Sequence, residues 1–450
     1  MKKTILQGAM SVIISLSLTA LHAQENPMDT LAQSVLKTQA KVDALSRVKL
    51  SGYIQGQYQV ADSVGIPSFA GGNFSPNVDN RFMLRRARLK ATYDGSWSQY
   101  VFQIDVSEKG FSIKDLYAKM TEQWMKTVSL TVGMQNRPFG YEIGYSSSLR
   151  ESPERGRMSQ IIFPGERDLG AMITIQRPKG KPLDFLKIEA GMFNGTGAPG
   201  AGASASDFDW KKDFIGRIRI DKTTKNEKMS YGLGASYYNG GWRNGTSSVW
   251  NMETDSAGLM AFRKTKDTLQ YGQISARNYI GFDGQLSIDW MGGLTTLRGE
   301  YIMGSQASSS SSTASPSTQP TTDAYIRNFN GAYFYFIQNI MHSKFDVIVK
   351  YDWYDPNTDI AGNEIAKNVL AFSGKSYKAT NAADLKFTTL GLGVAFKVDA
   401  NVKFVAYYDM VTNETTNAST TSGNTTTFNL KPYQNDIKDN VFTLRMQYKF

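Results

Sequence analysis

The sequence predicts an all-β fold, a 16-stranded antiparallel transmembrane β-barrel that follows a short helical segment. Two patterns predict it: short runs in which apolar and polar residues alternate, and a regular succession of long and short connections between those runs. A third observation is that no stretch after residue 24 is apolar enough to cross a bilayer as a helix. A β-protein can cross lipid only as a closed barrel, because every backbone polar group within the hydrocarbon must be paired.

The composition excludes several classes of function. The chain has 450 residues, a formal charge of +10, two histidines and no cysteine. The missing cysteines exclude a disulfide scaffold, a thiolate metal site, a cysteine nucleophile and a lipidated N-terminal cysteine. A hydrophobic fraction of 41% with 20% charged residues fits neither a disordered chain nor a bundle of membrane helices. We therefore expect no enzyme, no cofactor and no metal site.

Residues 1–23 have the pattern of a secretory signal peptide. Lys2 and Lys3 precede an apolar stretch from Ala9 to Leu21, and the small residue Ala23 stands at the expected cleavage site. Cleavage would lower the formal charge to +8, because it removes two lysines, and would leave His342 as the single histidine. We expect export to the outer membrane of a Gram-negative bacterium.

The next segment, 24–47, has helical rather than strand spacing. Apolar and threonine positions recur at intervals of three and four residues, which is heptad spacing; they are Met28, Leu31, Val35, Thr38, Val42 and Leu45. A short helix of this kind is marginal alone in water. The segment is therefore either a periplasmic helical trimer or a leader without fixed structure, and the sequence leaves both open.

The strands follow from strict alternation, which is clearest at the C-terminus. Phe442, Leu444 and Met446 point one way while Thr443 and Arg445 point the other. The same pattern predicts strands at 48–61, 80–93, 97–107, 112–121, 127–136, 169–178, 184–194, 211–221, 229–239, 276–290, 294–304, 325–338, 344–355, 386–398, 401–412 and 438–450. Sixteen strands is the size at which a barrel encloses an aqueous channel.

The connections distinguish the two rims of the barrel. Long segments follow the odd-numbered strands and short turns follow the even-numbered ones, with one short exception near 108–110. Transmembrane barrels have such long extracellular loops and short periplasmic turns. Two Ser/Thr/Asn-rich tracts, 305–322 and 411–427, predict mobile surface loops. Aromatic residues at strand ends predict the interfacial girdles; they are Trp97, Trp124, Tyr141, Trp290, Trp353 and Tyr354.

Alternation also places basic side chains inside the barrel. If Ala87 and Leu89 face lipid, then Arg86, Arg88 and Lys90 face water, and Arg85 falls on the lipid side. The candidates for contact with anions are Arg86, Arg88, Lys90, Arg150, Arg155, Arg157, Arg217, Arg219, Arg298, Lys350 and Arg445, and Lys403 and Lys449 also point inward. A basic lumen favours anions.

An alternative for these inward bases stays open. In this alternative, the inward bases pair with inward acids, such as Asp105, Asp115, Asp221, Glu300, Asp346 and Asp352. Paired charges of this kind would leave the lumen with little preference for either sign of ion.

Four short motifs resemble the phosphate-selective porin O and P family of Gram-negative outer-membrane porins. They are Arg85-Arg86-Ala87-Arg88-Leu89, Gly133 to Pro138-Phe139, Arg167-Asp168-Leu169-Gly170 and Phe193-Asn194-Gly195-Thr196-Gly197. Tyr448 and the terminal Phe450 look like the signal read by the barrel assembly machinery. The resemblance implies a barrel domain at 48–450, a homotrimer, and a third loop that folds inward and holds anions through arginines and lysines. In this chain the acids of the loop 137–168 offset its bases, so the phosphate site of the relatives does not carry over residue by residue.

The leading hypothesis is a channel for passive diffusion of small hydrophilic solutes, preferring anions, with phosphate selectivity as a further expectation. The expected partners are outer-membrane lipid and lipopolysaccharide, small anionic solutes and further copies of the chain. Nucleic acid is not expected, because the basic residues are dispersed. The alternative is a structural or adhesive barrel that links the membrane to the cell wall or to surface partners. A barrel enzyme would need a histidine-centred site, and an energy-coupled receptor would need a plug and about 22 strands.

Overall fold

The computed structural model describes residues 34–39, 42–43, 46–198, 207–254, 258–265, 269–367, 377–422 and 427–450. The predicted signal peptide at 1–23 and most of the heptad segment lie outside these residues. Of the described parts of that segment, 34–39, 42–43 and residue 46 are helical, and residue 47 is in a turn.

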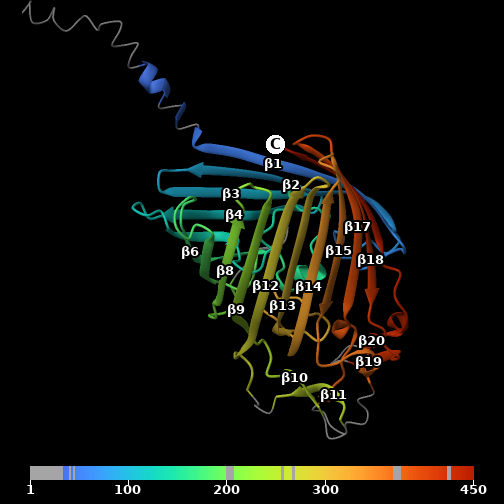
Figure 1. Ribbon diagram of the computed structural model, residues 1–450. Helices are drawn as coiled ribbons and strands as arrows, with labels where there is room; N and C mark the ends of the chain where they lie inside the picture. The colour runs from blue at the N-terminus through green and yellow to red at the C-terminus, as the bar shows by residue number, and fades with distance from the viewer. Residues whose placement is uncertain are drawn as a thin grey trace, which may run out of the picture.

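A closed antiparallel barrel forms the body of the molecule (Figure 1). Its sixteen strands are β1 (Val48–Ala61), β2 (Asn80–Asp94), β3 (Ser98–Ser107), β4 (Gly110–Thr121), β5 (Val128–Asn136), β6 (Arg167–Gln176), β7 (Leu186–Phe193), β8 (Asp213–Thr223), β9 (Met229–Arg243), β12 (Ile274–Trp290), β13 (Gly293–Ser308), β14 (Ala324–Asn339), β15 (Phe345–Asp355), β17 (Phe387–Lys397), β18 (Val402–Asn413) and β21 (Val441–Lys449). Each pairs with the next, and β1 pairs with β21, so the barrel has no free edge. The C-terminus accordingly lies beside β1 (Figure 1).

The two faces of the wall differ in polarity, as the alternation predicts. In β21, Thr443, Arg445 and Gln447 are buried in the interior, while Leu444 and Met446 are exposed on the outside. The same alternation recurs in β15, where Asp352 is buried and Tyr351 is exposed. An apolar outer face and a polar inner face are typical of a barrel surrounded by lipid.

The long loops carry short elements that the alternation did not predict. Strands β10 (Val249–Thr254) and β11 (Met260–Lys264) form a hairpin, and β10 pairs in parallel with the beginning of β14. Strand β16 (Tyr377–Lys378) pairs with β11, and β19 (Thr420–Ser422) pairs with β20 (Thr427–Asn429). These hairpins lie together at the lower end of the barrel in Figure 1, where they extend its wall.

The helices of the described residues also lie in the long loops. They are α3 (Arg157–Ile162) and the short 3-10 turns η1 (Gly362–Glu364), η3 (Ala382–Asp384) and η4 (Lys431–Gln434). In the part of the chain that the structure describes, no helix has the length and apolar character needed to cross a membrane.

An aromatic and aliphatic core fills part of the barrel interior. Phe139, Met158 and Phe163, from the segment between β5 and β6, pack against Tyr238 and Tyr354 of the wall. The girdle prediction is therefore wrong for Tyr354, which is buried inside, and for Tyr141, which lies in the same segment within the barrel. It fails because alternation cannot distinguish an inward ring from an outward one beside a packed loop. Trp97, Trp124 and Trp290 are exposed near the short turns, as a girdle requires.

The two Ser/Thr/Asn-rich tracts are not simply surface loops. Ser315 is buried, and its hydroxyl donates to the carbonyl of Ile162 in the barrel interior at 3.0 Å. Thr416 is buried as well, and it donates to the carbonyl of Ile365 at 3.0 Å. The prediction of surface exposure is wrong at these positions, because hydroxyl groups can satisfy backbone acceptors inside a fold as well as water can.

Candidate functional site

A loop between β5 and β6, residues 137–166, crosses the lumen; we call it the crossing loop. Its first part is fixed to one side of the wall. The backbone N–H of Gly140 donates to Ser236 Oγ on β9 at 2.9 Å. The N–H groups of Tyr141 and Glu142 donate to Glu300 Oε2 on β13 at 3.0 and 2.9 Å. A buried carboxylate thus holds two backbone groups of the loop.

The middle of the crossing loop is fixed to the opposite side. Ser147 contacts the hydroxyl of Tyr53 on β1, and its carbonyl accepts from Gln55 Nε2 at 3.0 Å. The carbonyl of Ser148 accepts from Gln447 Nε2 on β21 at 3.0 Å. Strand β9 is the ninth barrel strand and lies half the circumference away from β1. The loop is therefore anchored on opposite sides of the wall and crosses the lumen.

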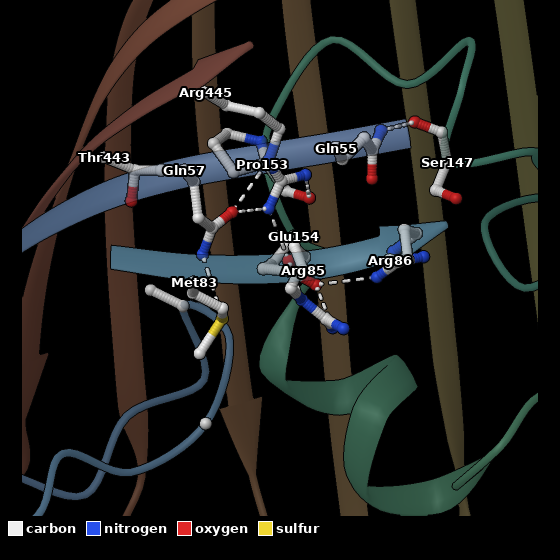
Figure 2. Close-up of polar contacts among 12 residues, drawn as sticks. Gln55, Gln57, Met83, Arg85, Arg86, Ser147, Pro153, Glu154, Thr443 and Arg445 are labelled. Atoms are coloured by element: carbon white, nitrogen blue, oxygen red, sulfur yellow. Dashed lines mark hydrogen bonds and ion pairs between the residues drawn. The ribbon is translucent and has the colours of Figure 1, made fainter. Parts of the chain in front are cut away.

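Beyond this anchor, Glu154 of the crossing loop meets three arginines of the wall (Figure 2). Its carboxylate receives two hydrogen bonds from Arg85, at 2.7 and 2.9 Å, and one from Arg445 at 2.7 Å. Arg86 Nη2 lies 3.6 Å away. We call Arg85, Arg86 and Arg445 the arginine cluster. Burial opposes ionisation of Glu154, but the three guanidinium groups outweigh burial and hold its pKa well below the usual range.

A β-bulge brings two consecutive arginines to the same carboxylate. The register between β1 and β2 shifts after Gln55, which faces Arg86, so that Gly56 faces Leu84 and Arg85 is the extra residue. Both arginine side chains then reach Glu154 inside the barrel (Figure 2). The prediction that Arg85 faces lipid is wrong, because a bulge interrupts the two-residue period and re-aims a side chain.

Most of the predicted anion contacts are neutralised by acids. The closest N–O distances are 3.1 Å for Arg88–Asp105, 2.8 Å for Arg217–Asp283, 2.6 Å for Arg219–Asp221, 3.0 Å for Arg298–Glu151 and 2.8 Å for Lys350–Asp352, and Arg155 pairs with Glu166. Asp115 and Asp346 pair with Arg167 and Lys397. Glu300 instead binds the crossing loop. The alternative that inward bases pair with inward acids therefore holds for these residues, with the acid on the wall for Arg88, Arg217, Arg219 and Lys350 and in the crossing loop for Arg155 and Arg298.

Three of the eleven candidates for anion contact make no ion pair with any described residue. Arg150 is 2% exposed and donates to the carbonyls of Ser152 and Pro153. Arg157 lies between the rings of Phe69 and Phe387, with its guanidinium carbon 4.5 and 3.6 Å from their centroids. The third is Lys90, which lines a polar cavity of the lumen.

That cavity, of about 440 Å³, lies between the crossing loop and the rim of short turns. We call it the basic vestibule. Lys187, Arg217 and Arg219 line it and are each paired with a carboxylate. Lys90, Lys119 and Arg137 also line it, and among the described residues none of these three has an acid at ion-pair distance. The vestibule therefore carries an excess of positive charge.

Sequence reasoning missed several side chains of the site. Lys119 alternates with the outward Ala118 and Met120, so its inward position could have been found from the period alone. Gln55 and Gln57 on β1 alternate with Ile54 and Gly56 in the same way. Gln55 holds the crossing loop at Ser147, and Gln57 accepts from Arg445 of the wall. Neither role had a local signal, because the partners are 92 and 388 residues distant.

The C-terminal residues close the barrel. The N–H of Phe450 donates to the carbonyl of Gly52 at 3.0 Å, and the N–H of Gly52 donates back at 3.1 Å. The side chains of Tyr448 and Phe450 are exposed on the outer face. Their role as an assembly signal stays a prediction.

No protein-family model and no curated protein matches the chain, so the family resemblance stays a prediction. Solved structures similar to it are outer-membrane proteins. The channel DcaP of Acinetobacter baumannii has 11% identity and a TM-score of 0.48, over 90% of this chain and 97% of that one. OmpF of Salmonella typhi has 10% identity, a TM-score of 0.48 and the same coverage. OprB of Pseudomonas putida has 8% identity and a TM-score of 0.43, over 91% and 95% of the two chains.

Proposed function

We propose that this protein is a porin of a Gram-negative outer membrane, a water-filled channel for passive diffusion of small hydrophilic solutes with a preference for anions. The closed barrel has an apolar outer face and a polar inner face, which supports insertion in lipid. Sixteen strands enclose enough space for an aqueous path even with a loop across it. No step of bond-making chemistry is part of this proposal.

The observation that carries the anion preference is the basic vestibule. Lys90, Lys119 and Arg137 lie there without carboxylate partners among the described residues, while the other bases of the vestibule are paired. Fixed positive charge in a narrow low-dielectric passage lowers the energy of an anion and raises that of a cation. Since the arginine cluster is already engaged by Glu154, we propose a general preference for anions in place of strict phosphate selectivity.

The surroundings of the channel follow from the same proposal. We propose that residues 1–23 are removed on export, that 24–47 remain in the periplasm, and that three copies associate in the membrane. Outer-membrane lipid and lipopolysaccharide would then cover the apolar outer face. The barrel assembly machinery would read Tyr448 and Phe450, which lie exposed at the closing strand.

The proposal is tested by solute uptake into proteoliposomes. Purified protein is reconstituted, and swelling rates are compared for an uncharged sugar, an organic anion and an organic cation of similar size. We expect swelling with all small solutes and the fastest rate for the anion. Swelling no faster than in protein-free liposomes would contradict the channel, and a faster rate for the cation would contradict the anion preference.

A further inference from the structure

The arginine cluster is unusual among the ion pairs of the lumen because one carboxylate serves three guanidinium groups. Within the described residues, Arg85, Arg86 and Arg445 each have Glu154 as their single acidic partner. The wall pairs, such as Arg217 with Asp283, are one to one. The cluster with Glu154 therefore has a net charge of about +2, held within the barrel.

Burial strengthens the electrostatic effect of this excess positive charge. The side chains of Arg86 and Arg445 are each 4% exposed, and that of Glu154 is 7% exposed. Arg86 Nε has no hydrogen-bond partner among the described residues. Arg85 is the member that reaches solvent, since its side chain is 26% exposed. A buried cation without a full complement of acids attracts any anion that can reach it.

The single acid comes from the crossing loop rather than from the wall. The backbone around Glu154 is held by the carbonyl of Pro153, which accepts from Arg445 Nη1 at 2.6 Å. Ser152, next along the loop, makes a hydrogen bond of 2.6 Å with the hydroxyl of Tyr335. The loop thus inserts its own carboxylate among three arginines inside the barrel, where it takes the place that a solute anion would occupy.

We propose that Glu154 is a specificity-determining residue: it acts as a built-in anion that covers the arginine cluster and limits the anion preference of the channel. This inference rests on the proposed channel function and names the residue that tunes it. If Glu154 loses its charge, the three guanidinium groups have no acid at ion-pair distance among the described residues. Anions are then favoured more strongly, and an oxyanion can bind in the vacated position.

The test compares the reversal potentials of the variants. Each variant is recorded in planar bilayers under the same KCl gradient, after heat-dependent gel mobility has shown that its barrel is folded. For Glu154→Gln we expect the chloride-to-potassium permeability ratio to rise by roughly fourfold or more, the effect of one unit charge at about 5 Å in water. We also expect inorganic phosphate to reduce the chloride current. The matched control is Glu151→Gln, which removes the same charge from the same loop beside one arginine, Arg298; its shift should be smaller, with no effect of phosphate.

A second variant keeps the inference testable if Glu154→Gln does not fold. Arg445→Gln leaves Glu154 its two hydrogen bonds from Arg85 and should lower the permeability ratio below that of the wild type. An unchanged ratio in either variant, or an equal shift in Glu154→Gln and Glu151→Gln, would overturn the inference. So would an equal rise of both ion currents, since that reports a loop released from the lumen. A wild type without conductance would overturn the proposed function, and this inference with it.

Discussion

At the residue scale, the lumen is governed by a few side chains whose partners belong to the crossing loop. Glu300 of the wall holds two N–H groups of the loop, while Glu154 of the loop is held by three arginines of the wall. The wall thus supplies the acid of one contact and the loop supplies the acid of the other. Because both are buried, removing one partner from either contact costs more than breaking an exposed ion pair, since it leaves a buried polar group unpaired.

The charge state of Glu154 gives a prediction about pH. Its pKa is held well below the usual range, so the carboxylate stays ionised when the pH falls from 7 to 5. A group with a lowered pKa stabilises the folded state above its unfolded pKa, near 4, and loses that contribution as the pH falls through the folded value. The difference in reversal potential between Glu154→Gln and the wild type should therefore be the same at pH 7 and pH 5. A difference that shrinks toward pH 5 would show that Glu154 is protonated there.

Gly140 gives a prediction about stability. It has a φ of 57°, and a Cβ at this position would overlap the Glu300 carboxylate. Gly140→Ala should displace Glu300 from its two N–H donors, at a cost of about 1–3 kcal/mol beyond the backbone strain. The matched control is Gly180→Ala, which has a φ of 84° but no atom within 4 Å of the new Cβ.

The measurement is the urea midpoint of unfolding in lipid, followed by tryptophan fluorescence. Gly140→Ala should unfold at clearly lower urea than Gly180→Ala. Equal midpoints would mean that the contact between Glu300 and the loop adds nothing to stability.

At the element scale, alternation alone predicted nearly all of the barrel wall. Strands such as β15 and β21 have one polar and one apolar face over their full length, so a period of two marks them without further information. The period fails at the β2 bulge, where Arg85 turns inward. It also fails in the long loops, where β10 pairs with the beginning of β14 and β11 pairs with β10 and β16.

The crossing loop could not be predicted from local sequence. Its path is set by contacts with residues far along the chain, such as Glu300 and Arg445. The inward charges of the wall could be placed by alternation. Alternation also puts the partners of the same-strand pairs Arg219–Asp221 and Lys350–Asp352 on one face, but it could not predict the pairs that join different strands or a strand and the loop. Arg298, for example, pairs with Glu151 of the loop and not with Glu300 on its own strand.

The closing strand gives a prediction about assembly. The Phe450 ring lies against Gly52 of β1, and the two residues exchange backbone hydrogen bonds. Phe450→Ala should reduce the fraction of protein that reaches the folded, heat-modifiable form in the outer membrane, because it removes the terminal aromatic ring. Phe442→Ala is the control, since it removes an exposed ring from the same strand away from the terminus. Equal folded fractions in the two variants would contradict a special role for Phe450.

At the scale of the whole molecule, the formal charge of +10 is an excess of bases over acids, and part of that excess lies in the lumen at Lys90, Lys119 and Arg137. The composition alone could not show this distribution. It emerges once the barrel brings strands β2, β4 and the crossing loop around one vestibule. This distribution of charge is therefore a property of the barrel's closure and of the loop inside it.

The vestibule gives the corresponding prediction. Replacing Lys90 and Lys119 together by glutamine should lower the chloride-to-potassium permeability ratio by roughly twofold to fourfold, since two unpaired positive charges leave the lumen. The control is a double change of Lys179 and Lys181 to glutamine, because these lysines are exposed in the turn between β6 and β7. A ratio that falls equally in both double variants would mean that the vestibule has no special role.

Single-channel recording of the wild-type protein in a planar bilayer with a KCl gradient tests the central claim most directly. The account predicts stepwise openings whose current is proportional to voltage, with a reversal potential displaced toward that of chloride. A bilayer that shows no steps at any protein concentration would contradict the channel itself. Clear steps with a reversal potential near that of potassium would contradict the role given to the basic vestibule.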